Sequence, residues 1–90
     1  MDFEWDEAKA SANLLKHGVD FADVATCFDD DRALTLADPD SEGEERFLTV
    51  ATDAFGRILV TYFTYRGATI RIISSRKASP GECRRYENQL

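Results

Sequence analysis

Two adjacent runs of β-type residues near the C-terminal end most constrain how this chain can fold. Residues 57–65 (RILVTYFTY) and 68–75 (ATIRIISS) are rich in β-branched and aromatic side chains, which favour strands. Only Arg66 and Gly67 separate the two runs, and a connection this short joins antiparallel strands. The sequence therefore predicts an antiparallel hairpin here.

Two earlier runs extend the predicted sheet to four antiparallel strands. Residues 33–37 (ALTLA) and 45–52 (ERFLTVAT) have strand character, and an acidic loop (DPDSEG) separates them. Near the N-terminus, Phe3 and Trp5 alternate with acidic residues, which suggests a short edge strand.

Capping signals predict two helices before the sheet. Asp6 suits the N-cap of a helix over residues 7–16, and Gly18 suits its end. Asp20 suits the start of a second helix, with Asp23 in the capping-box position. The apolar face of that helix follows the helical period through Phe21, Val24, Ala25 and Phe28. Helices followed by strands indicate an α+β domain with its helices packed on one face of the sheet.

Length and composition predict a single domain, residues 1–90. Hydrophobic residues make up 43% of the chain, enough for a core, and no apolar run approaches the ~20 residues of a membrane span. The acidic start MDFEWDE is unlike a signal peptide. Cys27 and Cys83 lack metal-ligand spacing, so we expect reduced thiols. These features predict a cytoplasmic protein that uses no metal or cofactor.

Charge is distributed unevenly along the chain. The net charge is −6, but residues 1–53 hold fifteen acidic against four basic side chains, and residues 54–90 hold seven basic against two acidic. This asymmetry permits a basic site for an anionic ligand on an acidic body that suits a basic partner. Charge runs are also common on solvated surfaces without a ligand.

The stretch from Ile70 to Tyr86 concentrates chemically active side chains. A predicted strand leads through Ser74, Ser75, Arg76 and Lys77 into a third helix. That helix has a clear start, because Ser79, Pro80 and Glu82 form an N-cap, a first-turn proline and a capping box. Cations beside a carboxylate and a phenol point to an anionic ligand, since a core needs none of these groups.

The chain resembles BrnT-type toxins of the RelE-like ribonuclease superfamily over residues 3–87. The resemblance is carried by Trp5, Asp6, Lys9, Asn13, the run Lys16–Phe21, the pair Glu45–Arg46, the strand Arg71–Ser74, and Arg76, Ala78, Glu82 and Tyr86. It implies a compact fold with a curved antiparallel sheet and RNA cleavage that halts translation. It also implies a BrnA-like antitoxin that neutralises the toxin and binds operator DNA, in a heterotetramer with two toxins.

Metal-independent RNA cleavage needs a base for the 2′-hydroxyl, cations for the phosphate and an acid for the leaving 5′-oxygen. We predict Arg71 and Arg76 as phosphate clamps, because guanidinium groups bind phosphate bidentately. Each could instead be a solvated arginine. In a regular strand their odd and even positions face opposite sides, so the pair requires a bulge.

The remaining candidates each have a structural alternative. His17 is the only histidine and a candidate for proton transfer, but it also suits a helix C-terminus. Glu45 is the candidate general base, with Arg46 beside it as an RNA contact, or the two form an exposed ion pair. Lys16 and Lys77 are predicted RNA contacts. Tyr86 is a candidate proton donor or base-stacking group, and otherwise packs the last helix on the sheet.

A second class of function competes with the ribonuclease. A non-catalytic interaction module that acts as co-repressor in a toxin–antitoxin-like complex would suit the acidic residues 1–53 and the sequence pI of about 4.6. A stand-alone DNA-binding domain is disfavoured, because no basic recognition helix is apparent.

Overall fold

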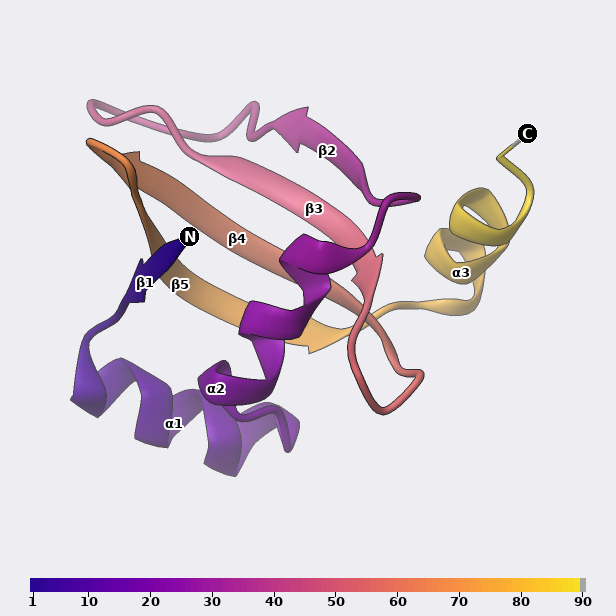
Figure 1. The fold of residues 1–90 in the computed structure, drawn as a ribbon, viewed down its shortest axis with the longest axis horizontal. Coiled ribbons are helices and arrows are strands. Elements are labelled where there is room, and N and C mark those ends of the chain that lie inside the picture. Colours follow the sequence, from indigo (N-terminus) through magenta and orange to yellow (C-terminus); the bar gives the residue numbers. More distant parts are fainter. Residues whose placement is uncertain (90) are drawn as a thin grey trace.

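The computed structural model describes residues 1–89 and contains one five-stranded sheet (Figure 1). Its strands are β1 (Asp2–Glu4), β2 (Leu34–Ala37), β3 (Phe47–Thr52), β4 (Ile58–Arg66) and β5 (Thr69–Lys77), in the order β1-β5-β4-β3-β2. The four antiparallel strands are confirmed. The sheet as a whole is mixed, because β1 pairs with β5 in parallel.

Four helical segments accompany the sheet. They are α1 (Glu7–His17), α2 (Phe21–Val24), the 3₁₀ helix η1 (Ala25–Asp29) and α3 (Pro80–Glu87). The prediction of one continuous second helix was wrong, since its α-helical part is a single turn. In Figure 1, α1 and α2 lie on the same side of the sheet, and α3 lies apart from them. None of the helices among residues 1–89 is long and apolar enough to span a membrane.

The predicted helix ends agree with the structure in most details. The Asp6 carboxylate accepts the backbone N–H of Lys9 at 3.1 Å, and Gly18 ends α1 with φ of 70°. Asp20 caps α2, but Asp23 does not complete a capping box there. It forms an ion pair instead with Arg57, the residue before β4, with 3.5 Å between Arg57 Nη2 and Asp23 Oδ2.

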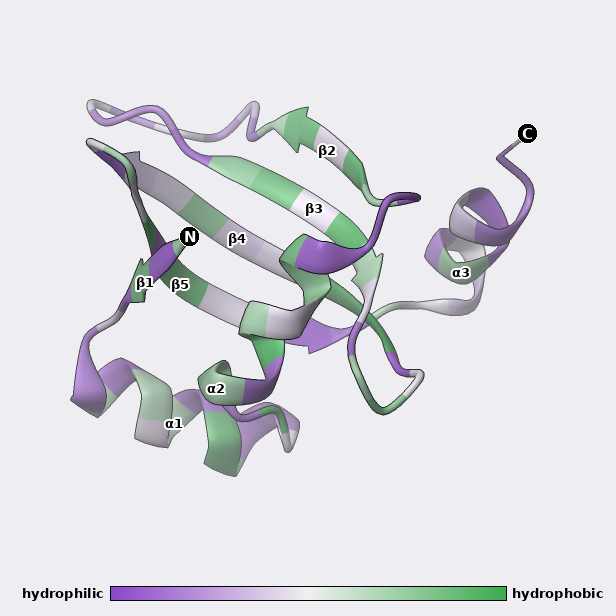
Figure 2. Ribbon diagram, in the orientation of Figure 1, coloured by the Kyte–Doolittle hydropathy of each residue, from purple (hydrophilic) through white to green (hydrophobic). Residues whose placement is uncertain are grey.

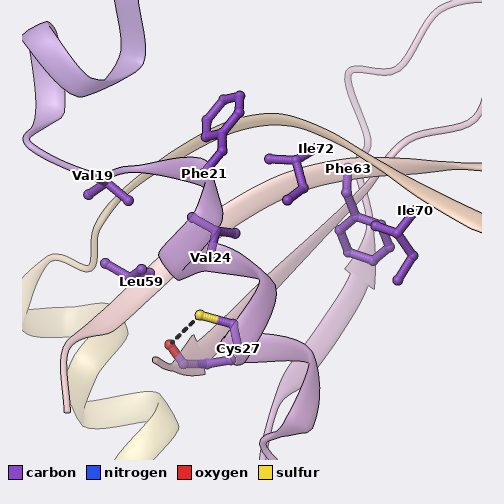
Figure 3. Packing of buried hydrophobic residues seen from close by; sticks show 9 residues of the cluster. Val19, Phe21, Val24, Cys27, Leu59, Phe63, Ile70 and Ile72 are labelled. Carbon is purple, nitrogen blue, oxygen red and sulfur yellow. Dashed lines mark hydrogen bonds between the residues drawn. The ribbon is translucent and has the colours of Figure 1, made fainter. Parts of the chain in front are cut away.

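The core lies between α2, η1 and one face of the sheet (Figure 3). It is built from Val19, Phe21, Val24, Cys27, Ala51, Leu59, Phe63, Ile70 and Ile72. Figure 2 shows the corresponding pattern, with hydrophobic residues on the strands and α2 and mainly hydrophilic residues along α3. The prediction that the helices pack on one face of the sheet was wrong for α3. This helix lies against the opposite face, here called the far face, where Glu82 of α3 binds Arg76 and Tyr86 of α3 accepts a hydrogen bond from Thr52.

Candidate functional site: the far face and its edge

A β-bulge in β5 brings the two predicted clamp arginines to one face. Tyr62 pairs with Ser74, but its neighbour Phe63 pairs with Ile72, so Ile73 is the extra residue. Paired residues of antiparallel strands project from the same face. The pair Phe63–Ile72 is buried in the core. Three other pairs project from the opposite side of the sheet, which is the far face: Val60 with Arg76, Tyr62 with Ser74, and Thr64 with Arg71. The condition for a paired clamp is therefore met.

Arg76 is held tightly by α3. Its Nη1 and Nη2 donate to the two carboxylate oxygens of Glu82 at 2.8 and 2.9 Å. Glu82 also accepts the backbone N–H of Ser79 at 2.8 Å, which completes the predicted capping box. The Arg76 guanidinium and the Ser79 hydrogen bonds lower the pKa of Glu82 to about 2 despite its partial burial. Glu82 in turn raises the pKa of Arg76.

Among the described residues, Arg71 makes one side-chain hydrogen bond. Its Nη1 donates to Glu4 Oε2 at 2.5 Å, across the parallel pairing in which Glu4 is the register partner of Arg71. The side chains are 28% and 40% exposed, so solvent reaches both groups. Glu4 was not among the predicted site residues, because the partner of a three-residue edge strand cannot be read from its sequence.

The other two arginines of this region also have carboxylate partners. Arg46 lies 3.2 Å from Asp38, and Arg66 lies 3.1 Å from Glu44. Glu45, the predicted base, is exposed just before β3, and its backbone carbonyl accepts a hydrogen bond from Thr64 at 2.7 Å. Its carboxylate makes no ion pair within the described chain. The structure therefore does not bring Glu45 into contact with the clamp arginines.

A pocket lies along the outer edge of β5, beside the bulge. Its lining residues are Lys9, Ala12, Asn13, Lys16 and His17 of α1 and Ile73 and Ser74 of β5. Because Ser74 projects from the far face between Arg71 and Arg76, the pocket adjoins the arginine pair. The predicted residues Lys16 and His17 are thus together. His17 is half-buried at the C-terminal end of α1. This position also suits its alternative role, in which the histidine stabilises the end of the helix.

Asn13 fixes α1 against this edge. Its Nδ2 donates to the backbone carbonyls of Val19 and Ser75 at 3.0 and 2.9 Å, and its Oδ1 accepts the Ser75 N–H at 3.0 Å. The side chain is 6% exposed. These hydrogen bonds explain structurally why Asn13 belongs to the family pattern. The sequence alone did not indicate this role.

Tyr86 lies in a different contact network. Its hydroxyl donates to Asp30 at 2.5 Å and accepts from Thr52 Oγ1 at 2.9 Å, and the residue is 8% exposed. Burial and the Asp30 carboxylate raise the pKa of Tyr86. Burial opposes ionisation of Asp30, but hydrogen bonds from Thr52, Tyr86 and Arg32 outweigh it and lower the pKa of Asp30. This geometry favours the packing role of Tyr86.

Lys77 is separated from the pair by the sheet itself. It is exposed at the end of β5 and pairs with Leu59, so its side chain projects from the face opposite to Arg76. Among residues 1–89, no group of three or more His, Cys, Asp or Glu side chains is arranged to hold a metal ion. The cations of the site come from α1 and β5.

Comparison with known proteins identifies the family. The family model described as ribonuclease toxin, BrnT, of type II toxin–antitoxin system matches residues 5–82. The chain belongs to the BrnT family. A crystal structure of the Brucella abortus ribonuclease toxin BrnT is similar, with a TM-score of 0.66 and 28% sequence identity, over 88% of this chain and 97% of that chain. No curated protein matches significantly. Membership of a toxin family of type II toxin–antitoxin systems implies an antitoxin partner.

Proposed function

We propose that this BrnT-family chain is a metal-independent endoribonuclease that cleaves by attack of the ribose 2′-oxygen. The observation that carries the proposal is the bulge at Ile73, since it sets Arg71 and Arg76 on one face beside the pocket that holds Lys16 and His17. The 2′-oxygen loses its proton and bonds to phosphorus, the P–O5′ bond breaks, and the 5′-oxygen is protonated. The products are a 2′,3′-cyclic phosphate and a 5′-hydroxyl end.

The arginines bind the phosphate by exchanging partners. In the free chain carboxylates occupy their donors, at 2.5 Å for Arg71 and at 2.8 and 2.9 Å for Arg76. A phosphate oxygen offers the same charge-assisted hydrogen bonds as a carboxylate. Arg71 is bound less tightly than Arg76, because it makes one hydrogen bond to a carboxylate that is 40% exposed. It is therefore the first of the two to exchange its carboxylate for a phosphate. Its guanidinium then stabilises the charge that develops on the phosphorane.

Proton transfer is assigned to His17 and Glu45. His17 protonates the leaving oxygen, because an imidazole changes charge near neutral pH and lies in the adjoining pocket. Glu45 remains the proposed base, reached by movement of the exposed segment before β3. Lys16 and Arg46 bind the RNA backbone on either side, and Lys77 does so beyond the strand end. Tyr86 contributes through the position of α3.

The proposal includes regulation by a partner. We expect a BrnA-like antitoxin to form a heterotetramer with two toxin chains, to abolish inhibition of translation, and to carry the complex to operator DNA. The acidic residues 1–53 suit a basic partner of this kind.

A co-repressor module without catalysis is the second candidate. It is favoured by the carboxylate partners of all four arginines Arg46, Arg66, Arg71 and Arg76, which reduce the charge offered to RNA. In that case the ion pairs would serve stability, and Arg71 would matter only for folding or for complex formation.

Cleavage of a defined RNA by the purified chain in excess EDTA separates the two candidates. The ribonuclease predicts cyclic phosphate and 5′-hydroxyl ends, with a rate reduced about 10²- to 10³-fold in Arg71→Ala. Arg84→Ala, which removes an exposed cation from α3, is the matched control and should cleave like wild type. A folded wild-type chain that leaves both free RNA and translating ribosomes intact would favour the co-repressor.

A further inference from the structure

The cations of the β5-edge pocket differ from the arginines of the far face in one respect. The arginines Arg46, Arg66, Arg71 and Arg76 all lie within 4.0 Å of a carboxylate oxygen, at 3.2, 3.1, 2.5 and 2.8 Å. Within the described chain, no ion pair involves Lys9 or Lys16, although both line the pocket. Two of the cations that lack a carboxylate partner in the described chain therefore lie in this pocket.

Helix α1 fixes the backbone positions of these lysines. Lys9, Ala12, Asn13 and Lys16 follow the spacing of one helix face, and all four line the pocket. Lys9 and Lys16 are separated by about 10 Å along the helix axis, from a rise of about 1.5 Å per residue. The hydrogen bonds of Asn13 to Ser75 hold this face against β5. The small side chain of Ala12 leaves space between the two ammonium groups.

The other polar residues that line the pocket are Asn13, His17 and Ser74. Ser74 lies on the wall that β5 provides, and its side chain is on the far face between the positions of Arg71 and Arg76. Two ammonium groups and a hydroxyl around an open depression offer donors and positive charge, with no carboxylate among the lining residues. Their preferred ligand is a phosphate group.

We propose that this pocket is a phosphate-binding subsite for the RNA backbone next to the scissile phosphate, and that Lys9 is one of its phosphate-binding residues. The inference rests on the proposed ribonuclease function and adds a residue that it did not include. The lysines bind flanking phosphates in the ground state as mobile point charges. The arginines, released from their carboxylates, then act on the reacting phosphate. Binding and cleavage are thereby assigned to different cations.

Binding of a 2′-O-methyl RNA tests the subsite without cleavage, because the probe lacks the attacking hydroxyl. Each phosphate contact on a single strand contributes about 0.7 to the slope of log K against log salt concentration. Lys9→Gln should reduce the slope by about this amount and weaken binding roughly three- to tenfold at low salt. Arg84→Gln, with the same change in net charge, should leave the slope unchanged.

A substitution at Ala12 provides a second test that does not disturb the capping region. Ala12 is exposed and glutamate suits a helix, so Ala12→Glu should fold while placing a carboxylate between the lysines. It should abolish most of the binding, and the neutral Ala12→Gln should retain more of it. Equal binding by wild type, Lys9→Gln and Ala12→Glu would overturn the subsite even if the wild type cleaves RNA.

Inorganic phosphate tests the pocket independently of ribonuclease activity. In a ¹H–¹⁵N NMR titration of the wild type, phosphate should shift the amide signals of Ala12, Asn13 and Ser74, and Ala12→Glu should remove these shifts. Such shifts in a chain that cleaves no RNA would reject the proposed function and retain the anion site. Shifts confined to other segments would overturn the subsite.

Discussion

Asn13 forms hydrogen bonds with the edge of β5 that a neighbouring strand would otherwise form. β1 pairs with β5 only at residues 69–71, so the outer edge of β5 has no neighbouring strand at Ser75. The Asn13 amide supplies one acceptor and one donor to that edge, as a strand would, and a second donor bond goes to Val19. Buried backbone groups that lose such partners are costly. This side chain therefore supports both the edge and the position of α1.

Replacement of Asn13 should destabilise the fold strongly. Asn13→Ala leaves the Ser75 N–H and the carbonyls of Ser75 and Val19 without their partners, and we expect a loss of about 2–4 kcal/mol in the free energy of unfolding. Urea denaturation followed by circular dichroism measures this change. Asn88→Ala, at an exposed position, should change it by less than about 0.5 kcal/mol. A similar small effect at Asn13 would refute the edge role.

The two thiols should differ in reactivity. Burial raises the pKa of Cys27 to about 12, and Asp53 and Asp30 add to the effect, so its thiolate is scarce at pH 8. Cys83 is only half-buried, on α3. Iodoacetamide at pH 8 should therefore label Cys83 in the native chain and Cys27 only after denaturation. Labelling of both at equal rates would contradict the packing shown in Figure 3.

At the level of strands and helices, the sequence predicted the features that are determined by residues close together in the chain. The caps at Asp6 and Ser79 and the β4–β5 hairpin follow from sequence, because each involves residues within a few positions of one another. The bulge at Ile73 does not, since it depends on the register with Tyr62 and Phe63. The sequence therefore predicted that Arg71 and Arg76 share a face only on the condition that β5 contains a bulge.

Non-local partners account for the other differences. The parallel pairing of β1 joins residues 2–4 to residues 69–71, and no local pattern encodes that register. Glu4 was missed for this reason. The short α2 has a similar cause, because the chain turns into η1 so that Cys27 and Phe28 can pack against the sheet. Tertiary packing overrides the helical period there.

The attachment of α3 should weaken in acid. The pKa of Glu82 is about 2 in the folded chain against 4.5 for a free side chain, so its charge stabilises the fold above pH 4.5 and ceases to do so as pH falls toward 2. Glu82→Gln keeps an acceptor for the cap but loses the charge. Because Glu82 is 31% exposed, we expect a cost of about 1 kcal/mol at neutral pH.

The pH dependence distinguishes this ion pair from a general effect of charge. The difference in unfolding free energy between wild type and Glu82→Gln should be constant above about pH 5.5 and should shrink between pH 4.5 and 2. Glu87→Gln, at an exposed position of the same helix, should show no such trend. A difference independent of pH would mean that Arg76 does not act through the Glu82 charge.

Across the whole molecule, folding pairs the acidic half of the chain with the basic half. Arg71 binds Glu4, and Arg57 contacts both Asp23 at 3.5 Å and Asp53 at 2.8 Å. The charge asymmetry along the sequence thus becomes a set of local ion pairs in space. What remains uncompensated at the β5 edge is then a small cationic pocket on an acidic protein, a combination that favours a local phosphate contact over general attraction to nucleic acid.

The same pairing of distant segments predicts cooperative unfolding of residues 1–90 as one domain. Trp5, the only tryptophan, packs edge-on against Phe21 at 6.0 Å and follows the strand that pairs with β5, so its fluorescence reports on contacts between the two ends of the chain. Urea transitions followed by Trp5 fluorescence and by far-ultraviolet circular dichroism should coincide, with a slope of about 1 kcal/mol/M for a domain of this size. An earlier fluorescence transition would mean that β1 and α1 detach from a sheet that stays folded. That outcome would also separate the lysines of α1 from the arginines of β5, so the same measurement bears on whether the site exists as one unit.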